Sequence, residues 1–166
     1  MQVWLQLLMA LIGTTGFALL FHIKLRNLPA AGVGGIMAWG CYLLLMHYTG
    51  NELVSNMTAS FIICIWAEIM ARIMKAPVNV FMITGLIPLI PGAGLYYTML
   101  SLINRDWPEM IVRAKSTGIA MLGIAIGIVA ESVIFLYIRD LSGEIAKNTE
   151  KKKEKRKKKK QSKKAK

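Results

Sequence analysis

The stretch ITGLIPLIPGAGLYYTM, residues 83–99, is apolar enough to lie in a membrane, yet it contains two prolines and three glycines. Proline removes a backbone N–H group and clashes with the preceding helical turn, and glycine adds backbone freedom. An uninterrupted helix is therefore not expected here. In hydrocarbon, irregular backbone is tolerated only where protein buries it or where it lines a water-filled cavity. The stretch thus predicts a membrane helix that is broken near its middle.

Apolar residues make up 55% of the 166 residues and form long blocks between short polar segments. Blocks near the roughly 20 residues that span a bilayer are typical of polytopic membrane proteins. The predicted fold class is all-α, with about five transmembrane helices and a discontinuous fourth. The expected spans are Val3–Phe21, Pro29–Tyr48, Leu53–Met74, Val78–Ile103 and Met110–Ile138.

Most of the net charge of +12 lies at the C-terminal end. Residues 1–140 contain eight Lys/Arg and six Asp/Glu, whereas residues 141–166 contain thirteen and three. No aromatic residues interleave with these cations, so the expected partner of this segment is anionic lipid and not nucleic acid. We therefore expect a transmembrane domain over residues 1–140 and a disordered cytoplasmic tail over residues 141–166.

The short loops predict an orientation. The loops at 22–28 and 72–77 carry Lys and Arg, whereas the loop at 47–52 carries neither. Because positive charge favours the cytoplasmic side, the N-terminus is expected outside the cell and the tail inside. Arg105 lies in a loop that this orientation places outside, so whether four or five helices cross stays open.

Two interpretations of the broken helix are possible. Exposed carbonyls and the N-terminus of the second half-helix can bind a polar or anionic substrate, as in transporters with discontinuous helices. Alternatively, the break only shapes helix packing. The residues expected at such a substrate site are Asn79, Thr84, Pro88, Pro91, Gly92, Gly94, Tyr96, Tyr97 and Thr98.

Two glutamates within the expected spans are candidate proton carriers. Glu68 belongs to a polar ridge that recurs every four residues, and it lies one turn from Arg72, so a local ion pair is the alternative interpretation. Glu131 shares a face with Gly123 and Gly127, which predict a close helix contact. A neutral glutamate bonded to a backbone carbonyl is the alternative at that position.

Signatures of common enzymes are missing from the sequence. It contains no HExxH, GxSxG or P-loop pattern and no paired cysteines. We therefore expect no catalytic residues, no metal site and no cofactor, with Cys41 and Cys64 acting as packing residues.

The run PVNVFMITGLIPLIPGAGLYYTM, residues 77–99, and the preceding WAEIMARIMKAP resemble the small-subunit half of the threonine/serine exporter family, the YjjB-like proteins. The resemblance implies a multi-pass protein of the cell membrane that exports threonine and serine, or dicarboxylates such as succinate, driven by a proton gradient. It also implies a larger membrane subunit of the same family as partner. The residues that match the family's motif are Pro88, Pro91, Gly92 and Gly94, followed by Tyr96, Tyr97 and Thr98.

Two function classes follow from these observations. The first is a transporter subunit in which the broken helix lies near a small-molecule substrate. The second is a membrane scaffold that transports nothing and stabilises a partner. They differ in whether the break, the polar ridge and Glu131 surround one hydrated cavity.

Overall fold

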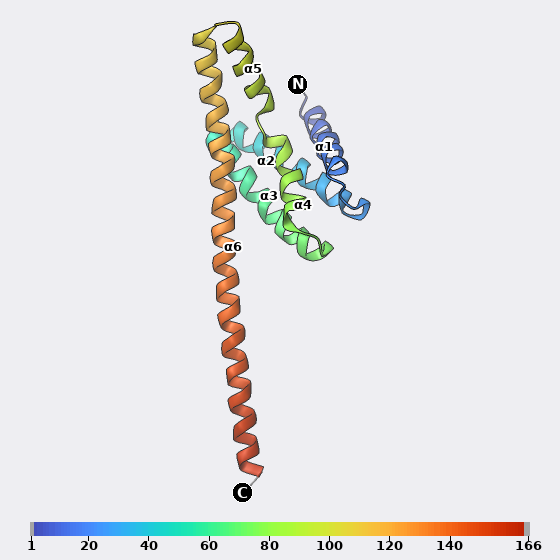
Figure 1. Cartoon of the computed structure of the whole chain (residues 1–166), viewed down its shortest axis with the longest axis vertical. Coiled ribbons are helices and arrows are strands. Elements are labelled where there is room, and N and C mark those ends of the chain that lie inside the picture. The colour runs from blue at the N-terminus through green and yellow to red at the C-terminus, as the bar shows by residue number, and fades with distance from the viewer. Residues whose placement is uncertain (1, 165–166) are drawn as a thin grey trace. The chain divides into compact units, whose positions relative to one another are not determined.

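The computed structural model describes the backbone of residues 2–164 and the side chains of residues 2–140. The described chain is helical and contains no strand (Figure 1). This confirms the predicted all-α class with a broken fourth span. The elements are α1 (Val3–Leu20), η1 (Leu25–Asn27), α2 (Leu28–Thr49), α3 (Glu52–Met74), α4 (Val78–Leu86), η2 (Ile87–Leu89), α5 (Gly92–Ile103) and α6 (Trp107–Lys164).

The chain divides into two compact units, Met1–Glu131 and Ser132–Lys166. The first unit holds α1 to α5 and the beginning of α6, and all contacts described below lie within it. In the second unit, α6 continues to Lys164. Side chains from residue 141 onward lie outside the described part, so the disordered cytoplasmic tail stays a prediction.

Helices α2 and α3 form a hairpin that is closed by two residues. Gly50 ends α2 in the left-handed region, with φ of 62°, where a residue without Cβ is least strained. Asn51 then caps α3, because its Oδ1 accepts hydrogen bonds from the N–H groups of Leu53 (3.0 Å) and Val54 (3.4 Å). The chain therefore reverses direction within a few residues.

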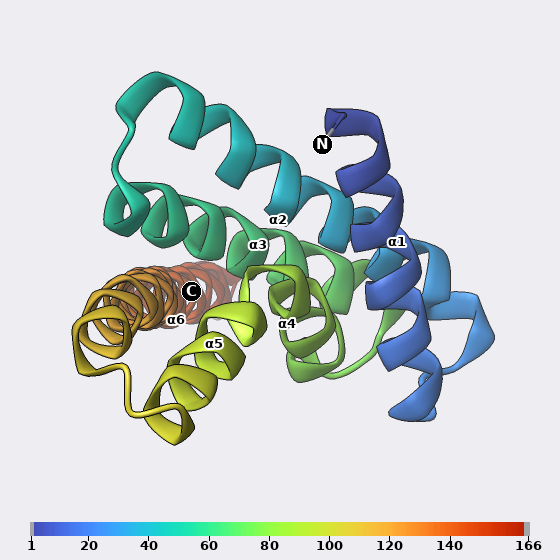
Figure 2. The same ribbon diagram turned by 90° about the horizontal axis from the view of Figure 1, so that it is seen from above.

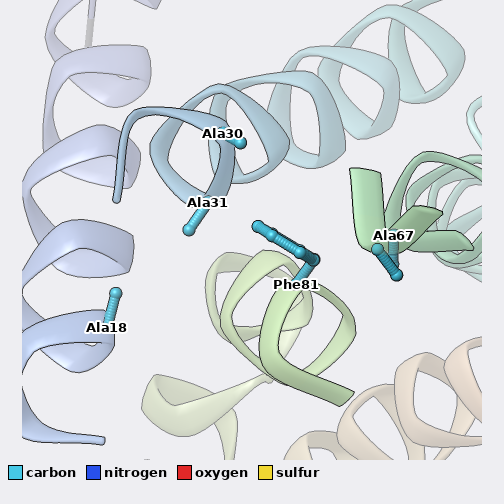
Figure 3. Packing of buried hydrophobic residues seen from close by; sticks show 6 residues of the cluster. Ala18, Ala30, Ala31, Ala67 and Phe81 are labelled. Carbon is cyan, nitrogen blue, oxygen red and sulfur yellow. The ribbon is translucent and has the colours of Figure 1, made fainter. Parts of the chain in front are cut away.

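Small residues allow the first four helices to pack closely. Helix α2 contacts α1, α3 and α4 (Figure 2). One apolar cluster contains five alanines and a single large side chain, Phe81 of α4, which extends between the alanines of α2 and α3 (Figure 3). Without hydrophobic driving force in lipid, such close approach is what holds helices together. The buried members of this cluster are Ala18, Ala30, Ala31, Ala67, Ala71 and Phe81.

The glycines of α6 contact the backbone of α3. A methyl group on Gly123 would lie 2.7 Å from the Leu53 carbonyl oxygen, and one on Gly127 would overlap the Ser60 hydroxyl and the Met57 carbonyl. Likewise, Gly34 of α2 lies against Ile63 and Trp66 of α3. The small-residue faces therefore pack within this chain and are not free for a partner protein.

The contacts between α3 and α6 show that both helices run in the same direction. Near their beginnings, the Ser116 hydroxyl donates to Glu52 Oε2 at 2.7 Å. Further along both helices, Gly127 lies against Ser60. The segment between them must therefore return the chain from the end of α3 to its beginning. Helices α4 and α5, which meet at an angle of 51°, form this segment (Figure 1).

This direction decides between a re-entrant loop and a crossing. The described residues contain four helices that are long and apolar enough to span a membrane, and a fifth if the bent pair is one span. A re-entrant pair would return to the side on which α3 ends, so α6 would run opposite to α3. Since α6 runs parallel to α3, we infer that the bent pair crosses once, which would give five crossings in all.

We predict that single cysteines at Asn104 and Ala76 lie on opposite sides of the membrane. In a background with Cys41→Ser and Cys64→Ser, Asn104→Cys should react with a membrane-impermeant maleimide in intact cells. Ala76→Cys should react only after permeabilisation, because the basic loop that contains it is expected inside. Labelling of both positions from the same side would contradict five crossings.

A matched pair of glycine substitutions in α6 tests the contact with α3. Gly127→Ala should destabilise the protein by about 1–3 kcal/mol, because the backbone atoms that its methyl group meets cannot move aside. Gly118→Ala should be neutral or stabilising by up to about 1 kcal/mol, because no atom lies near its added methyl and alanine favours helix. Thermal unfolding in detergent measures both, and equal shifts would rule out this contact.

Candidate functional site

The break between α4 and α5 results from two prolines. Pro88 has no N–H group to continue α4, and the chain tightens into the short 3-10 helix η2. Pro91 follows with φ of −77° and ψ of 60°, the geometry of an inverse γ-turn. This turn is closed by the N–H group of Gly92, which donates to the Ile90 carbonyl at 2.7 Å. Helix α5 then begins in a new direction.

The carbonyl groups of the break are paired locally. The Ile87 carbonyl accepts from the Ile90 N–H at 3.2 Å, and the Pro91 carbonyl accepts from the Leu95 N–H at 3.1 Å. The Ile90 carbonyl is occupied by the γ-turn. The expectation of exposed, unpaired carbonyls is therefore not met at these three positions. The N–H groups in the first turn of α5, such as those of Ala93 and Gly94, have no partner within the helix and can bind a ligand.

The inner side of the break is apolar. Leu86 and Leu89 are buried in a cluster with Ala59 and Ile63 of α3, and Ile124 of α6 packs against the same cluster. The side chains packed around Leu86 and Leu89 in this cluster are thus apolar, whereas Gly94 further along α5 lies against the Thr117 hydroxyl. The exposed part of the break is on the other side of the chain, where Ile90 and Gly92 are accessible.

The predicted residues that follow the break lie along α5. Tyr96 and Tyr97 are exposed, and their rings meet edge-on with centroids 5.3 Å apart. The guanidinium carbon of Arg113 lies 5.0 Å from the centroid of the Tyr97 ring, a cation–π contact between α5 and α6. Thr98 Oγ1 donates to the Gly94 carbonyl at 2.7 Å.

The two predicted residues that precede the break line a different cavity. Asn79 and Thr84 of α4 contribute to a cavity of about 190 Å³ whose other walls include Phe21 and Ile23. Thr84 Oγ1 donates to the Val80 carbonyl at 2.8 Å, so its hydroxyl is already bonded within α4. Asn79 is exposed. These residues are therefore separate from the group around Pro91.

The two glutamates approach each other across the contact between α3 and α6. Glu68 Oε2 lies 3.8 Å from Nε of Arg72, so the expected local ion pair is present, but at the long limit of such pairs. Glu131 lies one turn beyond Gly127, and only 7% of its surface is exposed. It is within electrostatic reach of both Glu68 and Cys64.

No cation or hydrogen-bond donor is paired with the Glu131 carboxylate among residues 2–140. Thr14 Oγ1 is the one fully buried side-chain polar atom without a partner within residues 2–140, so the Glu131 carboxyl oxygens retain some accessible surface. An acidic side chain inside a membrane span is nevertheless a candidate functional group. A carboxyl group in such surroundings is suited to bind and release a proton.

The sequence-predicted residues thus fall into three places. Asn79 and Thr84 line one cavity, the residues from Pro88 to Thr98 form the break and α5, and Glu68 of α3 and Glu131 of α6 lie within electrostatic reach of each other. Neither of the two cavities described among residues 2–140 is lined by members of all three groups. Within residues 2–140, no three His, Cys, Asp or Glu side chains lie close enough together to hold a metal ion.

Sequence reasoning missed one pocket entirely. A cavity of about 320 Å³ lies where the loop after α1 meets the loop after α3. The cations of these loops were the available signal, but in the sequence they indicated only orientation. Their clustering depends on two segments that lie about 50 positions apart in the chain.

Comparison with known proteins places residues 6–134 in one family. The family model described as Threonine/Serine exporter, ThrE, matches residues 6–134, from α1 through the part of α6 that contains Glu131. No solved structure matches this chain. The match confirms the family resemblance seen in residues 77–99 but does not distinguish the subunit halves, and the family is described as one of exporters. This multi-pass membrane protein therefore belongs to the threonine/serine exporter family.

Proposed function

We propose that this chain is the small subunit of a proton-coupled exporter in the cell membrane, acting with a larger membrane subunit of the same family. Its substrates are threonine and serine, or dicarboxylates such as succinate. The observation that carries the proposal is Glu131, a largely buried residue whose carboxyl group forms no ion pair within residues 2–140 and lies within electrostatic reach of Glu68. An acidic side chain inside a membrane span typically marks a proton or ion path, which favours a proton-coupled carrier over a scaffold.

The two carboxyl groups offer a path for the proton. Glu131 binds a proton within the membrane, where its neutral form is tolerated without a partner. Glu68 lies on the half of α3 that ends at the basic loop, and it is paired with the exposed side chain of Arg72. We propose that a proton entering from outside passes from Glu131 towards Glu68 and leaves on the cytoplasmic side as the substrate leaves in the opposite direction.

The first turn of α5 is the proposed contact for the substrate. Threonine, serine and succinate all carry a carboxylate, which the unpaired N–H groups of Ala93 and Gly94 and the helix dipole favour. Gly92 keeps this end of the helix accessible, since no atom lies near where its side chain would begin. Tyr96, Tyr97 and Thr98 follow on the next turn.

A scaffold remains the second candidate function because the inner side of the break is packed and its carbonyl groups are paired. Its three paired carbonyls and the buried side chains of Leu86 and Leu89 are what a packing kink requires. Under this alternative the break shapes the surface that meets the partner, and the substrate contacts the larger subunit alone.

Straightening the break separates the two candidates. The double variant Pro91→Ala, Gly92→Ala restores an N–H group and favours continuous helix by roughly 3 kcal/mol for the proline and about 1 kcal/mol for the glycine. If the start of α5 binds substrate, export per assembled complex should fall to background while the amount of complex changes little. Gly118→Ala is the control, because it also adds a methyl group in open space to a helix but lies in α6, outside the break.

A larger effect on the amount of complex than on export per complex would favour the scaffold. In that case the double variant reduces the amount of complex in the membrane, and the complexes that do form export normally. Quantifying the complex by co-purification and the export rate in the same cells gives both values.

Replacing Glu131 tests the proton coupling. Glu131→Gln keeps the shape of the side chain but cannot carry a proton, so the part of the export that depends on the pH gradient should be abolished while assembly is preserved. Glu109→Gln is the matched control, because Glu109 is exposed and forms an ion pair with Arg113 at 2.6 Å. Vesicles that contain both subunits and labelled threonine, serine or succinate report the rates.

Two results would contradict the proposal in different ways. Full gradient-driven export by Glu131→Gln would exclude this carboxyl group as the proton carrier. Full export from vesicles that contain only this chain would show that no larger subunit is required.

A further inference from the structure

The pocket at the end of α1 is basic and has no acidic residue in its wall. Its cavity of about 320 Å³ is lined by the cationic side chains of Lys24, Arg26 and Lys75, together with His22. Three cations that share a pocket without a carboxylate repel one another, and an anion between them relieves this repulsion. Lys and Arg both donate charge-assisted hydrogen bonds to phosphate and carboxylate oxygens. The charge of the pocket thus indicates an oxyanion ligand.

Asn27 supplies an independent observation. It lines the same pocket and is only 6% exposed. Its side chain makes no capping hydrogen bond to α2, and no other group among residues 2–140 is bonded to it. The Asn27 side-chain amide is not among the fully buried polar atoms that lack a partner within residues 2–140, so it retains accessible surface through which it can donate to a ligand. Here the amide borders the cavity in which the cations meet.

An apolar groove continues from this pocket. The neighbouring cavity of about 190 Å³ shares Phe21, Ile23 and Val80 with the basic pocket and extends to Ile83. Phe21, the residue after α1, and Ile83 of α4 are exposed, with 57% and 48% of their surfaces accessible, and both helices belong to candidate membrane spans. A basic pocket that opens into an exposed apolar groove matches a molecule with an anionic head and a hydrocarbon chain.

The position in the membrane fits the same class of ligand. The loops after α1 and α3 are the ones that positive charge places on the cytoplasmic side. Basic pockets between transmembrane helices on that side are suited to the head groups of anionic lipids. A free phosphate or a substrate carboxylate would fill the basic pocket but would leave the apolar groove unused.

We propose that the pocket and groove bind one anionic phospholipid of the inner leaflet. Lys24, Arg26 and Lys75 contact the phosphate, and the Asn27 amide donates a hydrogen bond to it. One acyl chain lies along Phe21, Ile23 and Ile83. The bound lipid joins the end of α1 to the beginning of α4 and stabilises the packing of the two loops.

Native mass spectrometry of the full chain tests the proposal directly. The protein is titrated with phosphatidylglycerol and with phosphatidylcholine of the same acyl chains. Phosphatidylglycerol should bind with higher affinity, and the triple variant Lys24→Gln, Arg26→Gln, Lys75→Gln should lose about a hundredfold, since each cation contributes about 1 kcal/mol. The control triple variant is Arg105→Gln, Lys115→Gln, Arg139→Gln, which removes equal charge elsewhere and should retain the tight site.

A second variant distinguishes loss of lipid binding from misfolding and changes the pocket alone. Asn27→Asp changes the size of the side chain very little but adds a negative charge beside the phosphate, so it should also remove the tight site. Because every variant keeps the basic C-terminal segment, lipid held by that segment contributes equally to all of them. Equal phosphatidylglycerol affinity of the wild type, the pocket variants and the control would overturn the proposal.

Competition distinguishes the source of the anion. Inorganic phosphate, threonine and succinate at millimolar concentration should not displace phosphatidylglycerol, because none of them occupies the groove. Displacement by phosphate would assign the pocket to a free anion, and displacement by threonine or succinate would assign it to the exported substrate. Either result would refute a lipid site.

Discussion

The close contact between α3 and α6 determines how the rest of the chain is arranged. It exists because Gly123 and Gly127 have no side chains, so the α6 backbone can lie against the carbonyl groups of Leu53 and Met57. In lipid, where burial of apolar surface gives no advantage, such packing is a main source of helix association. The contact also holds the two helices in the same direction, which requires the chain between them to cross the membrane once.

Two features follow from that requirement. The segment from Val78 to Ile103 has to cross as a bent pair, and the prolines place its bend where η2 and the γ-turn can pair their own carbonyls. The same contact brings Glu131, one turn beyond Gly127, to the side of α3 that carries Glu68. Irregular backbone and a buried acid, both costly in hydrocarbon, thus depend on one helix interface.

The spans and the break could be predicted from sequence because block length and proline act locally. The direction of α6 could not, since it depends on contacts such as that of Ser116 with Glu52, 64 positions away. Carbonyl pairing in the break was also missed, because Pro91 fixes φ but not ψ, and ψ decides whether a γ-turn forms. The basic pocket required two separate loops to meet, and Asn27 gives no signal on its own.

Cross-linking between α3 and α6 is the most direct test of this arrangement. With Cys41→Ser and Cys64→Ser as background, Glu52→Cys is paired either with Ser116→Cys or with Ser132→Cys, and a short bifunctional thiol reagent is added to membranes. Parallel helices predict rapid cross-linking of the pair at 52 and 116, whose native side chains are hydrogen-bonded at 2.7 Å, and little of the pair at 52 and 132. Preferential cross-linking of the pair at 52 and 132 would show antiparallel helices and contradict both the single crossing and the apposition of the two glutamates.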